Sequence, residues 1–159
     1  RRVLFRSISP DFKTISCVRS GEWGLYDIAS DRYERLVRQV REAGLKVALS
    51  SASRSAQQVL RSTNIESYFD VIIDGHSTRK EKPDPESFLL AAQALGFSTC
   101  DCVVFEDAAL GVRAGLAGGF TVVGIGRPEY LPEAQLVIPG LEGLTLNDLL
   151  TQLSGATVA

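Results

Sequence analysis

The chain has 159 residues, of which 45% are hydrophobic and 23% are charged, with a formal net charge of -2 at pH 7. At this length we expect one domain that buries about 70% of the surface of the unfolded chain. The hydrophobic content excludes a disordered tail, and no apolar run approaches the ~20 residues that a membrane-spanning helix needs. The 17 basic and 19 acidic residues create no field that attracts nucleic acid or an anionic membrane. We therefore expect a small-molecule ligand, with no nucleic-acid and no membrane partner.

The numbers of Met, Cys and His residues narrow the class of protein further. The sequence contains no Met, so we interpret it as a processed chain, a trimmed piece or a fragment. Cys17, Cys100 and Cys102 form an odd set without paired spacing, which favours a reducing compartment and a cytoplasmic protein over a disulfide framework. The C-x-C pair has no second pair to complete a zinc site, and a single His76 makes a Ser-His-Asp or Cys-His mechanism a poor candidate.

Helices and strands are predicted to alternate from residue 31 onward. A helix begins behind the candidate N-cap pair Ser30-Asp31 and ends before Gly44, with Leu36, Val37, Val40 and, more weakly, Ala43 on one face. The later elements are a strand over 45–50, a helix over 54–62, a strand over 71–74, a helix over 85–95, a strand over 102–105, a helix over 108–117, a strand over 120–126, a weaker strand over 136–138 and a closing helix over 146–153. This alternation indicates an α/β fold, with helices covering both faces of a parallel sheet.

The first 30 residues show no comparable order. Residues 1–8 could form a strand, but the rest has no sustained period and contains two turn-forming glycines, Gly21 and Gly24. The start, RRVLFRS, reads like one translation frame of a sequencing adapter, which would make it foreign sequence. We therefore divide the chain into an irregular or foreign segment 1–30, a core domain 31–153 and a tail 154–159.

Residues capable of chemistry follow three of the predicted strands. Ligands of an open parallel sheet bind outside the carboxyl ends of its strands, so these positions are the places to look. After the strand 45–50, the segment Ser51, Ala52, Ser53, Arg54 and Ser55 enters a helix whose free N–H groups and dipole suit a phosphate. Ser at a helix start is more often only a cap, so this segment alone is a weak indication.

A lysine precedes the next long helix in the run Glu81-Lys82-Pro83-Asp84-Pro85. Pro83 favours an extended backbone at Lys82, Asp84 is a good N-cap, and Pro85 fits the first helical turn. Lys82 held on such a stiff segment could neutralise a phosphoryl group. An isolated surface lysine is normally only a solvated charge.

Two adjacent carboxylates, Glu106 and Asp107, end the apolar strand over 102–105. Mg²⁺ prefers a carboxylate or two together with water and substrate phosphate oxygens, so the pair is a candidate metal site. The alternative is structural: one carboxylate would be the N-cap of the next helix and the other would interact with the helix dipole. For this pair alone, we consider the two interpretations equally good.

The order of these features resembles motifs two, three and four of the haloacid dehalogenase superfamily. The match is close over residues 31 to about 150, where SSASRS, VIIDG, EKPDPESFLLAAQALG, VVFEDAALGVRAG and VVGIGRPEYL look like the β-phosphoglucomutase branch. Residues 74–75 and 126–129 carry that finer resemblance. The resemblance implies a Rossmann-like three-layer α/β/α core. The helical cap of the family has no counterpart, since residues 9–30 are too few for it.

The resemblance also implies roles for the candidate residues. In that family an N-terminal strand ends in Asp-x-Asp, whose first Asp attacks phosphorus to form an aspartyl-phosphate and whose second is the general acid/base. Ser51 and the amides after it would hold the transferred phosphoryl group, and Lys82 would neutralise its charge. Glu106 and Asp107 would hold Mg²⁺ directly or through water. The implied reaction converts β-glucose 1-phosphate to glucose 6-phosphate, and we expect a monomer that binds a small phosphorylated sugar.

The N-terminal part of the sequence departs from this pattern. No Asp-x-Asp precedes residue 31, and the candidate first strand, residues 2–5, is followed by Arg6-Ser7-Ile8. Arg6 has no acceptor lone pair and Ile8 can neither give nor take a proton, so neither can replace the nucleophile or the general acid/base. We expect residues 2–8 to fill the central position of the sheet, because an empty position there would leave buried backbone groups unpaired.

We expect the chain as written to be inactive, and alternatives to the mutase function remain. A sugar-phosphate phosphatase of the same superfamily is the nearest, and a non-catalytic domain that binds a phosphosugar or Mg²⁺ is of a different class. A nucleotide-binding Rossmann domain is disfavoured, because Glu129 stands where the third glycine of the fingerprint belongs.

Overall fold

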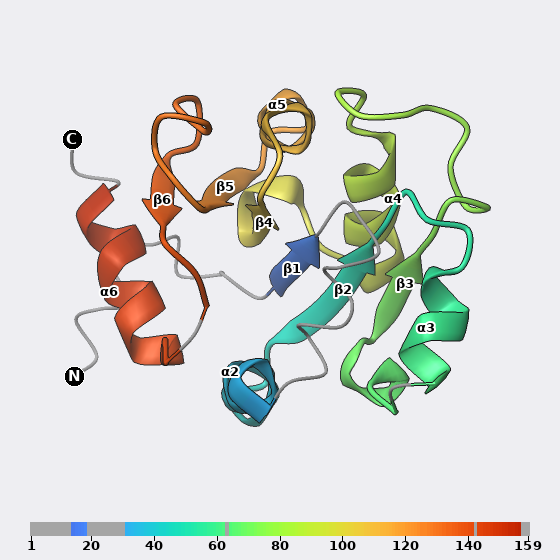
Figure 1. The fold of residues 1–159 in the computed structure, drawn as a ribbon, viewed down its shortest axis with the longest axis horizontal. Coiled ribbons are helices and arrows are strands. Elements are labelled where there is room, and N and C mark those ends of the chain that lie inside the picture. The colour runs from blue at the N-terminus through green and yellow to red at the C-terminus, as the bar shows by residue number, and fades with distance from the viewer. Residues whose placement is uncertain (1–13, 19–30, 63, 142, 157–159) are drawn as a thin grey trace.

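A computed structural model of the chain describes residues 14–18, 31–62, 64–141 and 143–156. Within these residues six strands form one parallel sheet in the order β3-β2-β1-β4-β5-β6 (Figure 1). The strands are β1 (Thr14–Val18), β2 (Lys46–Ser50), β3 (Val71–Ile73), β4 (Cys102–Glu106), β5 (Thr121–Ile125) and β6 (Leu136–Ile138). The helices are α2 (Asp31–Glu42), α3 (Ala56–Ser62), α4 (Glu86–Leu95), α5 (Ala109–Ala117) and α6 (Leu146–Ala156), with short 3₁₀ turns η2 (Glu66–Tyr68) and η3 (Thr99–Asp101).

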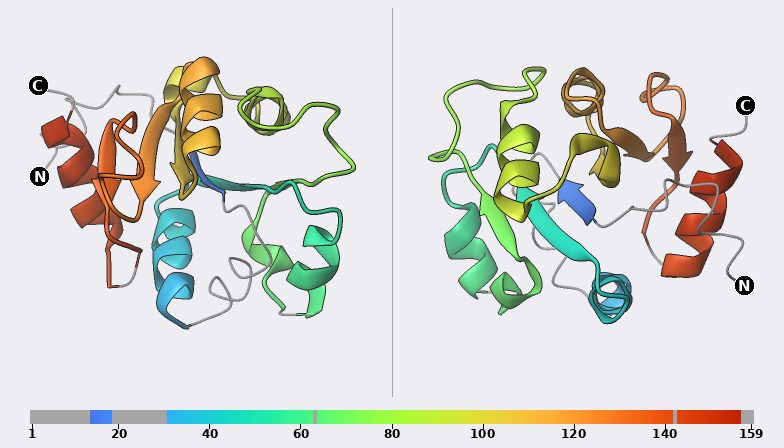
Figure 2. Two further views of the ribbon diagram at one scale, coloured as in Figure 1. Left: turned by 45° about the horizontal axis from the view of Figure 1, so that its top comes forward. Right: turned by 180° about the vertical axis from the view of Figure 1, so that it is seen from behind.

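Helices cover both faces of the sheet. Helices α4 and α5 lie on one face and α2 and α3 on the other (Figure 2). In β4, Val103 and Phe105 pack in the buried cluster that includes residues of α2, α3 and α6, whereas Cys102 and Val104 pack with α4 and α5. Because alternate residues of a strand share a face, Glu106 belongs to the α4 and α5 side.

The predicted alternation of helices and strands from residue 31 onward is confirmed, with element ends that shift by one to three residues. Gly44 follows α2 in the left-handed conformation with φ +77°, as predicted, and Gly96 ends α4 in the same way with φ 78°. Helix α6 runs to Ala156 rather than to 153, so the predicted tail begins later. Within the described ranges, no helix combines the length and the apolar character that a bilayer crossing requires.

The central strand is the main departure from the predictions. Thr14–Val18 pairs on one side with β2, through Val18 opposite Ser50, and on the other with β4, through Cys17 opposite Phe105. The prediction that residues 2–8 fill this position is therefore wrong, and those residues lie outside the described part of the chain. Thr, Ile and Val favour strands, but the run is only five residues long and has no clear alternation.

The expectation of irregular structure over residues 1–30 is likewise wrong for residues 14–18, which belong to the sheet of the core domain. Pairing with two neighbouring strands decides the conformation of this segment. For residues 1–13 and 19–30, which the structure does not describe, the irregular or foreign character remains a prediction.

Asp70 joins the starts of β2 and β3. Its Oδ2 accepts a hydrogen bond from the Val47 amide at 2.9 Å, its Oδ1 accepts one from Lys46 Nζ at 3.0 Å, and its own amide donates to the Val47 carbonyl at 2.7 Å. Partial burial raises the pKa of Asp70, but these hydrogen bonds and the charges of Lys46 and Arg41 outweigh it and lower the pKa overall. The ionised form of Asp70 therefore stabilises the folded state.

We predict that Asp70→Asn lowers the free energy of unfolding by about 1 kcal/mol at neutral pH, because charge-assisted hydrogen bonds are lost at a partly exposed site. The folded pKa lies below the ordinary value of 3.8, so the stabilisation is present above that value and is lost as the pH falls through the folded pKa. Urea unfolding of both proteins at about pH 7 and about pH 3 measures this. An equal difference at the two pH values would contradict the assignment to ionised Asp70.

Candidate active site

The segments that follow β2 and β4 and the loop that precedes α4 come to the same edge of the sheet. Strands β2 and β4 flank β1, where Val18 is level with Ser50 and Cys17 is level with Phe105. The ends of β2 and β4 therefore lie at the same level, with one strand between them. Lys82, from the loop before α4, reaches across to the end of β4 and contacts Glu106. Three of the predicted site segments thus share one edge.

Lys82 and Glu106 form a buried ion pair at this edge. Lys82 Nζ donates to Glu106 Oε1, and the side chains are 12% and 0% exposed. The Ala108 amide donates to the other oxygen, Oε2, at 3.3 Å, and the ring centroid of Phe88 lies 4.9 Å from Lys82 Nζ. Burial raises the pKa of Glu106, and the charge and hydrogen bond of Lys82 oppose this rise. The carboxylate can be buried here because the lysine is its partner.

Gly111 brings the backbone of α5 directly onto the Glu106 carboxylate. A Cβ at position 111 would lie 2.0 Å from Glu106 Cδ and 2.3 Å from each carboxylate oxygen. No side chain fits there unless Glu106 moves. The sequence pattern does not single out this residue, although a glycine within the first turns of a predicted helix, shortly after an acidic pair, is the signal that could have found it.

Hydrogen bonds from α4 and its N-terminal residues hold the loop that carries Lys82. Asp84 Oδ1 accepts from the Glu86 amide at 3.0 Å, and Glu86 Oε2 accepts from the amides of Arg79 and Lys80, both at 2.7 Å. Helix α4 begins at Glu86, one residue later than predicted, so its N-cap residue is Pro85 and the prediction that Asp84 is the N-cap is wrong. Asp84 lies one residue before the N-cap and binds the first helical amide from there. These contacts limit how far the loop around Lys82 can move.

The segment after β2 forms a compact turn. Ser51 is 5% exposed, its amide donates to the Ile73 carbonyl at 2.8 Å, and its Oγ accepts from the Ser53 amide at 3.2 Å. Ser53 Oγ accepts from the Ser55 amide at 3.2 Å and lies 2.9 Å from Ser55 Oγ. Helix α3 starts only at Ala56, so residues 51–55 precede the helix, where 54–62 was predicted to be helical. Ala52 and Arg54 are exposed at this edge.

The loop after β3 braces this turn. The Gly75 amide donates to the Ser53 carbonyl at 3.2 Å, and a Cβ at position 75 would lie 2.4 Å from the Ala52 carbonyl oxygen. Asp74 accepts hydrogen bonds from the amides of His76 and Ser77 and from the Ser77 hydroxyl. Burial raises the pKa of Asp74, but these hydrogen bonds lower it overall. The pair 74–75 therefore shapes the edge of the site.

Asp107 follows Glu106 and is partly buried. The two carboxylates differ in burial, since Glu106 is fully buried and accepts hydrogen bonds from Lys82 and from the Ala108 amide. Within the described part of the chain, no group of three or more His, Cys, Asp or Glu side chains has the arrangement of a metal site. One carboxylate at a ligand edge still suits Mg²⁺, which fills the rest of its octahedron with water and phosphate oxygens.

We predict that Lys82→Met lowers the free energy of unfolding by about 3–5 kcal/mol, because it leaves a buried carboxyl group without its partner. The pKa of Glu106 then rises further, since burial acts on it without the lysine charge. An acid with a raised folded pKa holds its proton more tightly in the folded state, so the variant should lose stability as the pH rises above the ordinary value of 4.5. Unfolding curves between about pH 5 and about pH 8 test this.

The control for Lys82→Met is the double variant Lys82→Met/Glu106→Met, which removes both charges and should recover part of the lost stability. A double variant that is less stable than Lys82→Met alone would mean that the cost does not come from the unpaired carboxyl group.

We also predict that Gly111→Ala destabilises the fold by about 1–3 kcal/mol, because the added methyl group overlaps Glu106. The matched control is Gly155→Ala in α6, where a Cβ meets nothing within 4 Å. The control should stabilise the helix by about 0.5–1 kcal/mol, since alanine has less freedom to lose on folding. Thermal unfolding of both variants decides, and a Gly111→Ala variant as stable as Gly155→Ala would refute the overlap.

Comparison with known proteins agrees with the geometry. A family model for haloacid dehalogenase-like hydrolase matches residues 21–119. The β-phosphoglucomutase of Bacillus subtilis is 38% identical over 112 residues, which are 70% of this chain and 50% of that protein. Hexitol phosphatase A of Escherichia coli is 39% identical over 80 residues, covering 48% of this chain and 37% of that protein.

A solved structure extends the comparison to the fold. The crystal structure of β-phosphoglucomutase from Clostridium difficile superposes with a TM-score of 0.75 at 32% identity, covering 80% of this chain and 57% of that chain. This chain spans about half the length of the curated relatives it matches. The family model covers more than half of the chain, and the resemblance inferred from the sequence motifs is thereby confirmed. The chain belongs to the haloacid dehalogenase-like hydrolase family.

Proposed function

We propose that this chain provides the core of a β-phosphoglucomutase-like phosphotransferase that acts on a small phosphorylated sugar. The observation that carries this proposal is the buried Lys82–Glu106 pair, which lies at the same edge of the sheet as the Ser51 turn. Relatives named β-phosphoglucomutase and hexitol phosphatase support the choice of substrate class.

Lys82 would neutralise charge on the phosphoryl group. Its ammonium group has three N–H donors. One donates a hydrogen bond to Glu106, and the other two are available to phosphoryl oxygens. Catalysis of phosphoryl transfer consists mainly of positioning and of electrostatic stabilisation of the equatorial oxygens. A cation with a side chain only 12% exposed is screened little by water, so its charge acts strongly at this position.

The turn of residues 51–55 would hold the same phosphoryl group from the β2 side. Ser51 Oγ accepts from the Ser53 amide, so the hydroxyl proton of Ser51 is available to a phosphoryl oxygen. Arg54 is exposed at the rim of the turn and would add a cation on the solvent side. Ala52, Ser53 and Ser55 would shape this half of the site.

Asp107 is the residue that would bind Mg²⁺ directly, and Glu106 would act through water or through Lys82. For Glu106 the assignment follows from its surroundings, because it is fully buried and both of its oxygens accept hydrogen bonds. Asp107 is less buried and follows directly at the same edge of the sheet. A bound Mg²⁺ would supply positive charge beside the phosphoryl oxygens.

The nucleophile that the family resemblance implies is not found in this sequence. The central strand is Thr14–Val18, so the residues that follow it in the sequence are Arg19, Ser20 and Gly21, and the comparison with Arg6 and Ile8 does not hold. No Asp-x-Asp occurs before residue 31. An arginine has no lone pair with which to attack phosphorus. We therefore infer that the chain as written does not turn over a phosphosugar.

Two alternatives have specific support. Similarity to hexitol phosphatase A favours a sugar-phosphate phosphatase, which would release inorganic phosphate instead of forming glucose 6-phosphate. The combination of Ser51, Lys82 and Asp107 without an Asp-x-Asp favours a non-catalytic phosphosugar-binding domain. A cytoplasmic location and a monomeric state remain predictions from the sequence.

We predict that the purified 159-residue chain forms no glucose 6-phosphate from β-glucose 1-phosphate in the presence of Mg²⁺, because it lacks the attacking carboxylate. A coupled dehydrogenase assay detects glucose 6-phosphate, and a phosphate-release assay on the same samples detects hydrolysis. Turnover in either assay that scales with protein concentration would contradict the inferred loss of the nucleophile.

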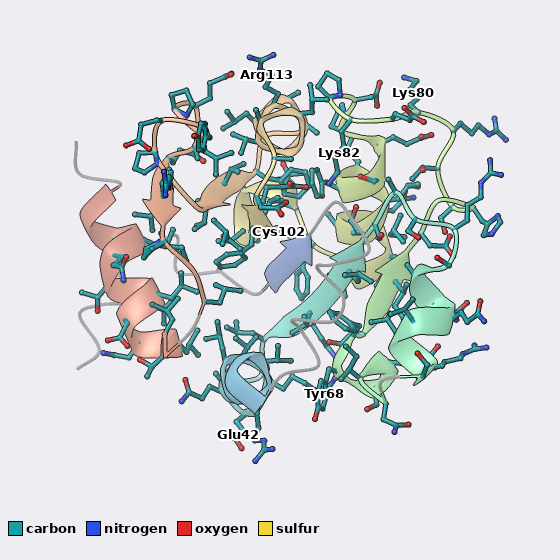
Figure 3. All side chains as sticks on the ribbon, in the orientation of Figure 1. Glu42, Tyr68, Lys80, Lys82, Cys102 and Arg113 are labelled. Carbon is teal, nitrogen blue, oxygen red and sulfur yellow. The ribbon has the colours of Figure 1, made fainter. Side chains whose placement is uncertain are left out.

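We further predict that the chain binds inorganic phosphate or glucose 6-phosphate. Lys82→Met should weaken this binding at least about tenfold, because one charge-assisted hydrogen bond is lost. The matched control is Lys80→Met in the same loop, because Lys80 is exposed and pairs with Asp84. Figure 3 labels both lysines. Titration calorimetry should give equal affinities for the control and the wild type. Absence of binding by the wild type, or an equal loss in Lys80→Met, would refute the assigned site.

A further inference from the structure

Two buried serine hydroxyls between β2 and α4 have no hydrogen-bond partner among the residues that the structure describes. Ser50, the last residue of β2, is 1% exposed, and Ser87, in the first turn of α4, is 9% exposed. Buried hydroxyl groups are nearly always bonded, either to protein or to an ordered water molecule. Two exceptions in one helix–sheet interface call for a common explanation.

Helix α4 packs on β2 and runs in the opposite direction. Lys82, just before α4, contacts Glu106 at the carboxyl end of β4, whereas Gly96, just after α4, leads through η3 to the start of that strand. The N-terminal turn of α4 is therefore at the carboxyl edge of the sheet. Ser50 and Ser87 both lie at that edge.

The two serines occupy matching positions in this interface. Ala48 of β2 and Ala91 of α4 belong to one buried cluster. Ser50 lies two residues beyond Ala48 on the same strand face, a step of about 6.6 Å. Ser87 lies four residues before Ala91, a step of about 6 Å along the helix. Since the elements are antiparallel, both steps lead toward the carboxyl edge and bring the hydroxyls to the same layer.

We propose that Ser50 and Ser87 together hold one buried water molecule between β2 and α4. The hydroxyls are not hydrogen-bonded to each other, and both serines are buried. A water molecule can donate to and accept from both, and buried water occupies polar sites of this kind. The site uses none of the residues assigned to phosphoryl transfer and does not depend on that function.

The water site has a structural consequence. Ser50 immediately precedes Ser51, and Ser87 lies five residues after Lys82, in the helix whose first turn anchors the Lys82 loop. A water molecule bound to both serines ties the β2 side of the edge to the α4 side. It therefore helps to set the spacing between the turn of residues 51–55 and the loop that carries Lys82.

The test compares Ser50→Ala, Ser87→Ala and the double variant in the full 159-residue chain by thermal unfolding. Each single variant should lower Tm by about 2–4 °C, because each removes one partner of the water molecule. The double variant should have a Tm close to that of the less stable single variant, since the same water molecule is lost in all three. A rise in Tm for either single variant would show that the hydroxyls are unsatisfied. Additive losses would show that they share no ligand.

Ser154→Ala is the control for helix propensity, because the Ser154 hydroxyl bonds to the Leu150 carbonyl within α6 at 2.7 Å. The change in Tm caused by Ser87→Ala is compared with the change caused by this variant.

A high-resolution crystal structure of the chain tests the water site directly. It should show one water oxygen within hydrogen-bonding distance of both hydroxyls, whereas a direct contact between the two serines, or no density between them, would overturn the proposal.

Discussion

The buried ion pair between Lys82 and Glu106 connects the main parts of the fold at the carboxyl edge of the sheet. Glu106 ends β4, Lys82 comes from the loop before α4, and Gly111 brings the backbone of α5 against the carboxylate. Below this layer the same face of the sheet is apolar, with Val104 packed in the cluster that includes Phe88. A fully buried carboxylate is tolerated only with its partner in place, so the position of Lys82 is coupled to the stability of the fold.

The edge of the sheet consists of two halves, and close backbone approach shapes both. On the β4 side, the absence of a side chain at Gly111 makes room for Glu106. On the β2 side, the absence of a side chain at Gly75 lets the loop after β3 lie against the Ala52 carbonyl. Hydrogen bonds within each half complete the arrangement. The proposed phosphoryl site lies between two preorganised segments, as electrostatic stabilisation of a transferred group requires.

Membership of the haloacid dehalogenase-like hydrolase family and the proposed role of this chain are separate conclusions. The family follows from the model match over residues 21–119 and agrees with the fold. The role depends on individual side chains, and those of Lys82, Ser51 and Asp107 suit the binding of a phosphoryl group. The sequence after the central strand, Arg19-Ser20-Gly21, does not suit nucleophilic attack. Our proposal assigns to this chain the binding of a phosphoryl group and no nucleophilic attack on it.

The sequence alone determined the α/β class and most element positions after residue 31, and it singled out the candidate site residues. Apolar runs such as those of β4 and β5, each followed or preceded by glycine or acidic residues, are local signals that need no knowledge of neighbours. The resemblance to the family motifs implied that Lys82 and Glu106 belong to one site, and the structure brings the two side chains into contact. Tertiary structure decided the rest. Thr14–Val18 is a strand because β2 and β4 pair with it on both sides, and five residues carry too little pattern to show this. Tertiary contacts also give four other residues their roles, namely Gly75, Gly111, Ser50 and Ser87. These contacts join segments that are distant in the sequence. They depend on strand register and helix packing, so they exist only in the folded chain.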